Sequence, residues 1–188
     1  MLFRSRDGAR AGVRRGAGGT VTAMATPRAL TALVPGSFDP IPLGHVDVID
    51  QAARLFAAVK VVVMHNPAKP SGAFAPEERV RLATASLAHL ANVSVHLHAG
   101  LAIQAARDLG ADCIVKGVRS AADYDVESQM ASTNRAAGGP TTLLVVASPE
   151  HRHVASRYVR EIAHYGGDVT SFVPSVVADA LRARTRGT

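Results

Sequence analysis

Short apolar runs alternate with amphipathic stretches along most of this chain. The runs have the length of β-strands and lie at 29–34, 59–64, 93–97, 112–117 and 141–147. The stretches that repeat apolar residues at helical spacing lie at 45–56, 76–90, 101–109, 123–136, 151–164 and 174–184. Strands that alternate with helices indicate βαβ units. We therefore predict an α/β fold in which helices cover both faces of a parallel sheet.

The predicted sheet locates the candidate site before any motif is considered. In open α/β sheets, ligands bind beyond the carboxyl ends of the strands, where the strand order reverses. We expect the site in the loops that follow Val34, Met64, Val115 and Ala147. The pattern contains no internal repeat, and we predict that 29–188 forms a single domain.

The first 28 residues differ in composition from the rest of the chain. They hold six arginines and one acidic residue, Asp7, without an apolar period. We interpret 1–28 as a disordered basic extension. Its origin stays open between an organelle transit peptide, an upstream start that precedes a natural start at Met24, and a remnant of expression.

Composition narrows the class of protein. Hydrophobic residues make up 47% and charged residues 19%, as in ordinary globular proteins, and no run approaches the roughly 20 apolar residues of a membrane span. The formal net charge of +6 suits a polyanionic ligand, but the extension supplies much of this charge, which argues against a nucleic-acid-binding surface.

The single cysteine, Cys113, excludes an internal disulfide and fits a cytoplasmic location. We expect Cys113 to be a small buried hydrophobe.

The loop PGSFDPIPLGH, residues 35–45, carries the candidate chemistry. Gly36 and Ser37 directly follow the first strand, where backbone N–H groups can approach a phosphate. Gly44 and His45 begin the next helix, whose N-terminus attracts anions. The alternative is a tight turn with His45 on the surface. We expect Asp39 to brace the loop through local hydrogen bonds.

This loop resembles the PG(S/T)FDP…GH motif of the HxGH-type nucleotidyltransferases, and in particular of the phosphopantetheine adenylyltransferase family. Four further segments are similar to that family in the same order: NPAKP at 66–70, FAPEERV at 74–80, IVKGVRSAADYDVE at 114–127 and GGDVTSFVP at 166–174. The resemblance implies a Rossmann-like nucleotidyltransferase fold. It also implies transfer of AMP from ATP to 4′-phosphopantetheine, which yields dephospho-coenzyme A and pyrophosphate.

In that reaction the acceptor phosphate is already a nucleophile, so catalysis reduces to positioning and to stabilising charge on the α-phosphate. The resemblance assigns catalysis to His45, Lys69 and Arg119. It assigns acceptor binding to Ser37, Lys69, Ala102 and Lys116. It assigns ATP binding to Ser37, Phe38, His45, Gly117, Val118, Arg119, Glu127, His151, Arg152, His153, Val154, Ala155, Ser156 and Arg157.

Several of these residues have a plainer interpretation. Lys69 and Lys116 can be solvated surface lysines, which is the common location of this residue type. Glu127 lies one helical turn from Asp123, and both can belong to a solvated helix face.

The chain departs from the family pattern in two places. In HRHVASRYVRE, residues 151–161, Ala155 and Arg157 replace two of the three serines that the family usually carries, and only Ser156 remains. Backbone N–H groups at the helix start, or the charge of Arg152 or Arg157, can still bind the triphosphate. Pro42 stands where the family usually has a polar residue, which stiffens the loop.

The resemblance also implies cofactors and partners. ATP chemistry implies Mg²⁺ carried by the phosphates, and we predict no dedicated metal site because no His/Cys cluster or carboxylate pair is present. It implies a homohexamer and feedback binding of coenzyme A in the acceptor pocket, with no nucleic-acid and no membrane partner. Two alternatives stay open: a related adenylyl- or cytidylyltransferase with another phosphorylated acceptor, and a basic nucleic-acid-binding protein.

Overall fold

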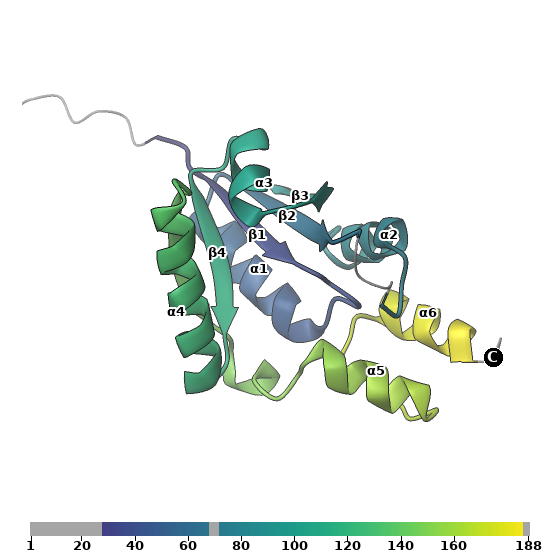
Figure 1. Cartoon of the computed structure of the whole chain (residues 1–188). Helices are drawn as coiled ribbons and strands as arrows, with labels where there is room; N and C mark the ends of the chain where they lie inside the picture. The colour runs from purple at the N-terminus through teal and green to yellow at the C-terminus, as the bar shows by residue number, and fades with distance from the viewer. Residues whose placement is uncertain (1–27, 68–71, 186–188) are drawn as a thin grey trace, which may run out of the picture.

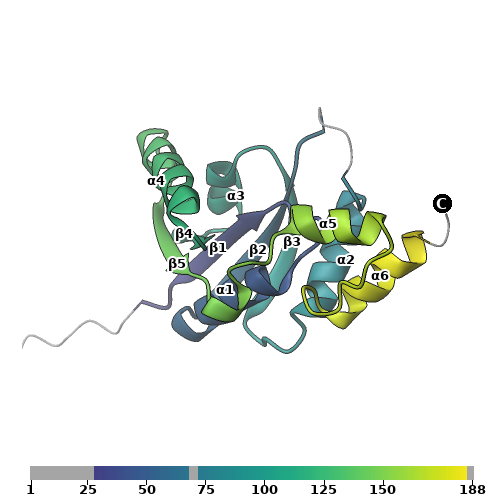
Figure 2. The same cartoon turned by 90° about the horizontal axis from the view of Figure 1, so that it is seen from below.

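A computed structural model describes residues 28–67 and 72–185, and within them one parallel sheet lies between two layers of helices (Figures 1 and 2). The strand order is β3-β2-β1-β4-β5, and all neighbouring pairs are parallel. The strands are β1 (Thr31–Gly36), β2 (Ala58–His65), β3 (Val93–Ala99), β4 (Cys113–Val118) and β5 (Thr141–Val146). The helices are α1 (Leu43–Leu55), α2 (Pro76–Ser86), α3 (Ala102–Asp108), α4 (Ala121–Ala136), the 3₁₀ turn η1 (Pro149–His151), α5 (Ser156–His164) and α6 (Ser175–Thr185).

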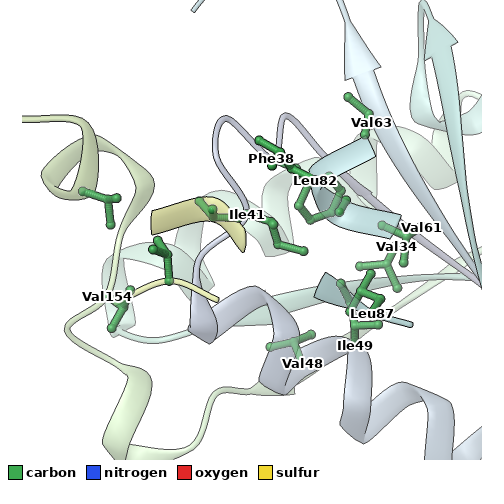
Figure 3. Close-up of a cluster of buried hydrophobic side chains, with 14 of the residues drawn as sticks. Val34, Phe38, Ile41, Val48, Ile49, Val61, Val63, Leu82, Leu87 and Val154 are labelled. Carbon is green, nitrogen blue, oxygen red and sulfur yellow. The ribbon is translucent and has the colours of Figure 1, made fainter. Parts of the chain in front are cut away.

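This architecture confirms the predicted α/β fold with helices on both faces. One face of the sheet packs on α1 and α2, with α6 against α2 and α5, and residues such as Val61, Ile49 and Leu82 meet in its core. Figure 3 shows these side chains together, with Val34 and Val63 beside them. A smaller core on the opposite face joins the sheet to α3 and includes residues on both: Leu33, Val62, Ala105, Ala106 and Ile114.

The predicted helix at 151–164 is wrong, because the segment is divided. Pro149–His151 forms the 3₁₀ turn, and α5 begins only at Ser156. The guanidinium Nη1 of Arg119 donates a 2.9 Å hydrogen bond to the carbonyl oxygen of Val154, which draws this stretch toward the sheet. Ala155 is extended, with φ −132° and ψ 138°, and so ends any helical continuity. The helix predicted at 76–90 also ends earlier, at Ser86.

The strand order reverses between β1 and β4, as the chain runs outward to β2 and β3 on one side and to β5 on the other. The ladder between β1 and β4 joins Ala32 with Cys113 and Leu33 with Ile114, and no pair follows these. The two strands therefore separate toward their carboxyl ends. This divergence opens the crevice in which ligands bind in sheets of this kind.

Asp39 braces the β1–α1 loop, but its hydrogen bonds are long-range, so the expectation of local bonds is wrong. Its carboxylate accepts 2.9 Å hydrogen bonds from the backbone N–H groups of Ala73 and Phe74. It also pairs with the buried guanidinium of Arg79 at 3.3 Å. These contacts tie the loop after β1 to the start of α2, across residues far apart in the sequence.

Three further expectations concern the N-terminal extension, Cys113 and membrane-spanning helices. Residues 1–27 of the predicted extension lie outside the described residues, whereas Arg28 forms a 2.6 Å ion pair with Asp112. Cys113 is buried, as expected, and burial raises the pKa of its thiol. Among the described helices, none combines the length and the apolar character needed to cross a bilayer.

Candidate active site

The loop between β1 and α1 brings His45 to the diverging strand ends. His45 lies on the first turn of α1, and its ring meets the ring of Phe38 edge-on, with the centroids 5.3 Å apart. Phe38 is buried in the core and has a left-handed φ of 43°. A Cβ atom at Gly36 would lie 2.9 Å from the ring of Phe38, so glycine at this position leaves the ring its place. The loop therefore holds His45 against a rigid aromatic support.

Two basic side chains, Arg119 and Lys116, act on His45. Burial of the imidazole, together with the charges of Arg119 and Lys116, lowers the pKa of His45 to about 4. The ring is consequently neutral at pH 7, with one nitrogen able to donate a hydrogen bond and the other able to accept one. A neutral donor beside two cations suits an anionic ligand that must lose its water shell.

The lowered pKa predicts a pH dependence of stability that is specific to His45. Between pH 6.5 and about 4 the unfolded chain binds a proton at this residue and the folded chain does not. The free energy of unfolding should therefore fall as the pH is lowered through this range, and His45→Gln should lose that part of the fall. Denaturant unfolding of both proteins at pH 8, 6, 5 and 4 measures the difference. If the free energies of unfolding of wild type and His45→Gln change in parallel with pH, the pKa of His45 is not lowered in the folded protein.

Lys116 lies in the carboxyl half of β4 and Arg119 directly follows the strand, and each faces an acid of α4. The ammonium of Lys116 lies 3.3 Å from Oε1 of Glu127. The Nε of Arg119 donates a 2.9 Å hydrogen bond to Asp123. Burial alone would raise the pKa of Asp123, but its hydrogen bonds with Arg119 and the charge of Arg119 lower the pKa overall. The two ion pairs fix the basic side chains at the crevice.

A cavity of about 130 Å³ opens where β1 and β4 diverge, with His45 in its wall. The first turn of α1 forms one side, and the end of β4 forms another. Gly117 permits close packing here, since a Cβ atom at this position would lie 2.8 Å from Val48 of α1. The cavity is lined by Val34, Pro35, Gly44, His45, Val48, Val115, Lys116, Gly117, Arg119, Asp123, Glu127, Ala147 and Val154.

A second cavity, of about 440 Å³, lies on the other face of the sheet, between α3 and α4. It shares Pro35, Lys116 and Glu127 with the first cavity, so the two meet at the Lys116–Glu127 pair. Its remaining walls are mostly apolar and include Gly36, Ser37, Met64, Gly100, Leu101, Ala102, Ile114, Met130, Ala131, Asn134 and Thr142. A ligand with an anionic end and a long, largely apolar body fits this combination.

The structure brings many of the sequence-predicted residues to these two cavities. His45, Gly117 and Arg119 line the first, Ser37 and Ala102 line the second, and Lys116 and Glu127 line both. Lys69 lies outside the described residues. The side chains of Phe38 and Val118 are buried and line neither cavity in the described part of the chain, although the ring of Phe38 supports His45 from behind.

Only some residues of the segment at 151–157 contribute to the walls of the two cavities. Val154 lines the first cavity, and Ser156 begins α5 with its hydroxyl donating a 3.0 Å hydrogen bond to the carbonyl oxygen of Pro40. His151, Arg152, His153, Ala155 and Arg157 do not line the described part of either cavity. The guanidinium of Arg157 stacks on its neighbour Tyr158, with its carbon 4.5 Å from the ring centre.

Sequence reasoning missed two kinds of site residue. Asp47, near the start of α1, accepts hydrogen bonds from the backbone N–H and the hydroxyl of Ser148, at 2.8 and 2.7 Å, and so positions the loop after β5. Burial would raise the pKa of Asp47, but these bonds and one from Gln51 lower it. The other kind is the apolar wall of the second cavity, including Met64 and Met130. An acid two residues after a helix-starting GH pair was a usable signal for Asp47, whereas the apolar wall residues resemble ordinary core residues.

In the described part of the chain, no three His, Cys, Asp or Glu side chains gather as a potential metal site. The charged groups at the crevice are the two cations Lys116 and Arg119 and the acids paired with them. An anionic ligand would find here two basic side chains and the N-terminus of α1.

Comparison with known proteins agrees with this geometry. A sequence model of the cytidylyltransferase-like family matches residues 33–162. The chain is 43% identical over 150 residues to a phosphopantetheine adenylyltransferase of Corynebacterium diphtheriae, covering 80% of this chain and 94% of that protein. It is 47% identical over 156 residues to one of Synechococcus sp. (strain JA-2-3B'a(2-13)), covering 82% of this chain and 98% of that protein.

A solved structure from Vibrio parahaemolyticus, of a protein assigned as a nicotinate-nucleotide adenylyltransferase, shares the fold at a TM-score of 0.56. The two sequences are 18% identical, and the match covers 82% of this chain and 99% of the other. The fold, the crevice at the strand ends and the sequence identity to these relatives agree, and the chain belongs to the cytidylyltransferase-like family and, within it, to the phosphopantetheine adenylyltransferases.

Proposed function

We propose that this protein transfers AMP from ATP to 4′-phosphopantetheine, forming dephospho-coenzyme A and releasing pyrophosphate. The observation that carries the proposal is the junction of two cavities at Lys116 and Glu127. The smaller cavity, with His45 and Arg119, takes the phosphates of ATP, and the larger one takes the pantetheine arm. The two reacting phosphates then meet at the carboxyl ends of β1 and β4.

The chemical step is an in-line displacement. An oxygen of the acceptor phosphate attacks the α-phosphorus of ATP, and the bond from that phosphorus to the bridging oxygen of the β-phosphate breaks. No proton has to be removed from the acceptor, so the step needs no general base. Neutral His45 donates a hydrogen bond to the α-phosphate as charge develops there, and Arg119 and Lys116 stabilise the surrounding oxygens.

The remaining phosphates of ATP are supported by the start of α5. The helix begins at Ser156, and its first backbone N–H groups lack partners within the helix. The hydroxyl of Ser156 is engaged with Pro40, so the backbone, rather than the missing serines, supplies the donors. Mg²⁺ enters bound to the phosphates of ATP and is part of the substrate, where it neutralises charge on the leaving pyrophosphate.

The acceptor is positioned by its two ends. Lys116 and Lys69 neutralise its phosphate, and Ser37 contacts the phosphates from the β1–α1 loop. The arm lies along the larger cavity against Ala102, Leu101 and Met130. Coenzyme A, which shares this arm, would bind in the same cavity as a feedback ligand.

The protein is further proposed to act as a homohexamer in the cytoplasm. Apolar side chains on α4 and β5 support an assembly, since Val126 and Val146 are each 58% exposed in the single chain. Residues 29–188 act as one catalytic domain, and 1–28 as an extension outside it. The mass of the protein in solution, measured by light scattering, tests the assembly.

A coupled pyrophosphate-release assay tests the reaction. The protein is supplied with ATP, Mg²⁺ and one acceptor: 4′-phosphopantetheine, nicotinamide mononucleotide or glycerol phosphate. We expect pyrophosphate only with 4′-phosphopantetheine, and dephospho-coenzyme A in equal amount. Turnover with another acceptor alone would replace the proposed substrate, and RNA binding without any turnover would favour the nucleic-acid-binding alternative.

A further inference from the structure

Three buried polar side-chain atoms in the described part of the chain have no hydrogen-bond partner: His98 Nδ1, Glu127 Oε2 and Thr142 Oγ1. Two of these three residues, Glu127 and Thr142, belong to the wall of the larger cavity. A buried hydroxyl without a partner is unfavourable and uncommon in native proteins. Because both residues belong to the wall of one cavity, a polar ligand in that cavity is the natural partner for these two oxygens.

The position of Thr142 is set by the sheet. Thr142 pairs with Ile114 in the register between β5 and β4, and Lys116 lies two residues farther along β4. Side chains two residues apart share a face, so Thr142 and Lys116 both face the cavity. Thr142 is displaced from Lys116 by about 7 Å along the strands and by one strand spacing, about 4.8 Å, across them.

The length of the proposed acceptor is compatible with this displacement. From its phosphorus the pantetheine arm runs through an ester oxygen, a methylene, a dimethyl-substituted carbon and a hydroxyl-bearing carbon to the carbonyl of its first amide. Those five bonds span about 6 Å when extended, at roughly 1.2 Å a bond. The strand positions of Lys116 and Thr142 are about 8 Å apart in a straight line, and a hydrogen bond of about 3 Å spans the difference. An arm whose phosphate is held by Lys116 therefore brings its first amide within hydrogen-bonding reach of Thr142.

We propose that Thr142 determines specificity for the acceptor by hydrogen-bonding, through its hydroxyl, to the first amide of the pantetheine arm. The inference rests on the proposed function and extends it to a residue at the base of the cavity. Without ligand, the hydroxyl has no partner, so its contribution is to binding rather than to folding. A neutral hydrogen bond of this kind changes affinity by up to about tenfold.

Thr142→Val tests the proposal, because valine has nearly the same shape and lacks the hydroxyl. We expect KM and Kd for 4′-phosphopantetheine to rise about 5- to 10-fold, with kcat and KM for ATP within twofold of wild type. Thr142→Ser keeps the hydroxyl and should bind the acceptor within about twofold of wild type. The melting temperature of ligand-free Thr142→Val should equal or exceed that of wild type, because an unpaired buried hydroxyl has been removed.

Two controls isolate the hydrogen bond. Thr141→Val changes the neighbouring exposed residue of β5, which faces away from the cavity, and should leave acceptor binding unchanged. The second control is a competition probe, 2,2-dimethylpropyl phosphate, which carries the phosphate and the dimethyl group but no amide. It should inhibit wild type and Thr142→Val equally.

The possible results distinguish an error in the role of Thr142 from an error in the proposed reaction. If wild type converts 4′-phosphopantetheine and Thr142→Val has the same KM and Kd, the role of Thr142 is wrong and the reaction stands. If wild type neither binds nor converts 4′-phosphopantetheine, both proposals are wrong. A lower melting temperature together with equal losses for ATP, acceptor and inhibitor would assign Thr142 a structural role and overturn the proposal.

Discussion

Replacing His45 with alanine is expected to lower kcat by about 100- to 1,000-fold, the range observed when one transition-state hydrogen-bond donor is removed. The imidazole lies at the start of α1, beside Arg119 and Lys116, and its depressed pKa keeps it neutral at pH 7. The imidazole therefore offers an N–H hydrogen-bond donor at the crevice and does not have to gain or lose a proton to do so. Alanine leaves the loop and the two cations in place but removes the donor that meets the developing charge.

Single-turnover release of pyrophosphate at pH 7.5, with saturating ATP and acceptor, measures this effect. The Kd for ATP should change by only a few fold, because the donor acts mainly on the transition state. His89→Ala, at an exposed position beyond α2, serves as the matched control and should retain wild-type turnover. Wild-type kcat in His45→Ala would remove His45 from the mechanism.

Replacing Asp39 with alanine is expected to lower the free energy of unfolding by about 3–5 kcal/mol, as for a broken buried ion pair. Asp39 and Arg79 are 5% and 7% exposed, so the guanidinium would be left buried without its counter-charge. The backbone N–H groups of Ala73 and Phe74 would lose their acceptor at the same time. Both losses fall on the contact between the β1–α1 loop and the start of α2.

Urea unfolding of wild type and variant at pH 7.5 measures the change. Asp50→Ala is the matched control: Asp50 pairs with Arg54 on the exposed face of α1, and its loss should cost less than about 1 kcal/mol. Asp39→Asn, which can still accept a hydrogen bond, should fall between wild type and Asp39→Ala. If Asp39→Ala costs no more than the control, the loop is held by other contacts.

Most elements of the fold could be predicted from local patterns. The run at 59–64 became β2, and Pro76 opens α2, because a strand's apolar period and a proline at a first helical turn act over neighbouring residues. Gly110 follows α3 with φ 64°, as a helix-ending glycine does. The loop at 35–45 was recognisable because its glycines, His45 and the helix start are contiguous. The sequence by itself therefore determined the parallel α/β plan and the strand-end location of the candidate site.

Tertiary structure decided the features that depend on residues far apart in the chain. The backbone N–H groups that donate to Asp39 lie more than 30 residues away, and Arg119 divides 151–164 by donating a hydrogen bond to the carbonyl of Val154. The unpaired hydroxyl of Thr142 is visible only once β4, β5 and α4 enclose the larger cavity. No sequence period encodes such contacts, because they arise from the packing of separate elements and from the desolvation of the groups between them.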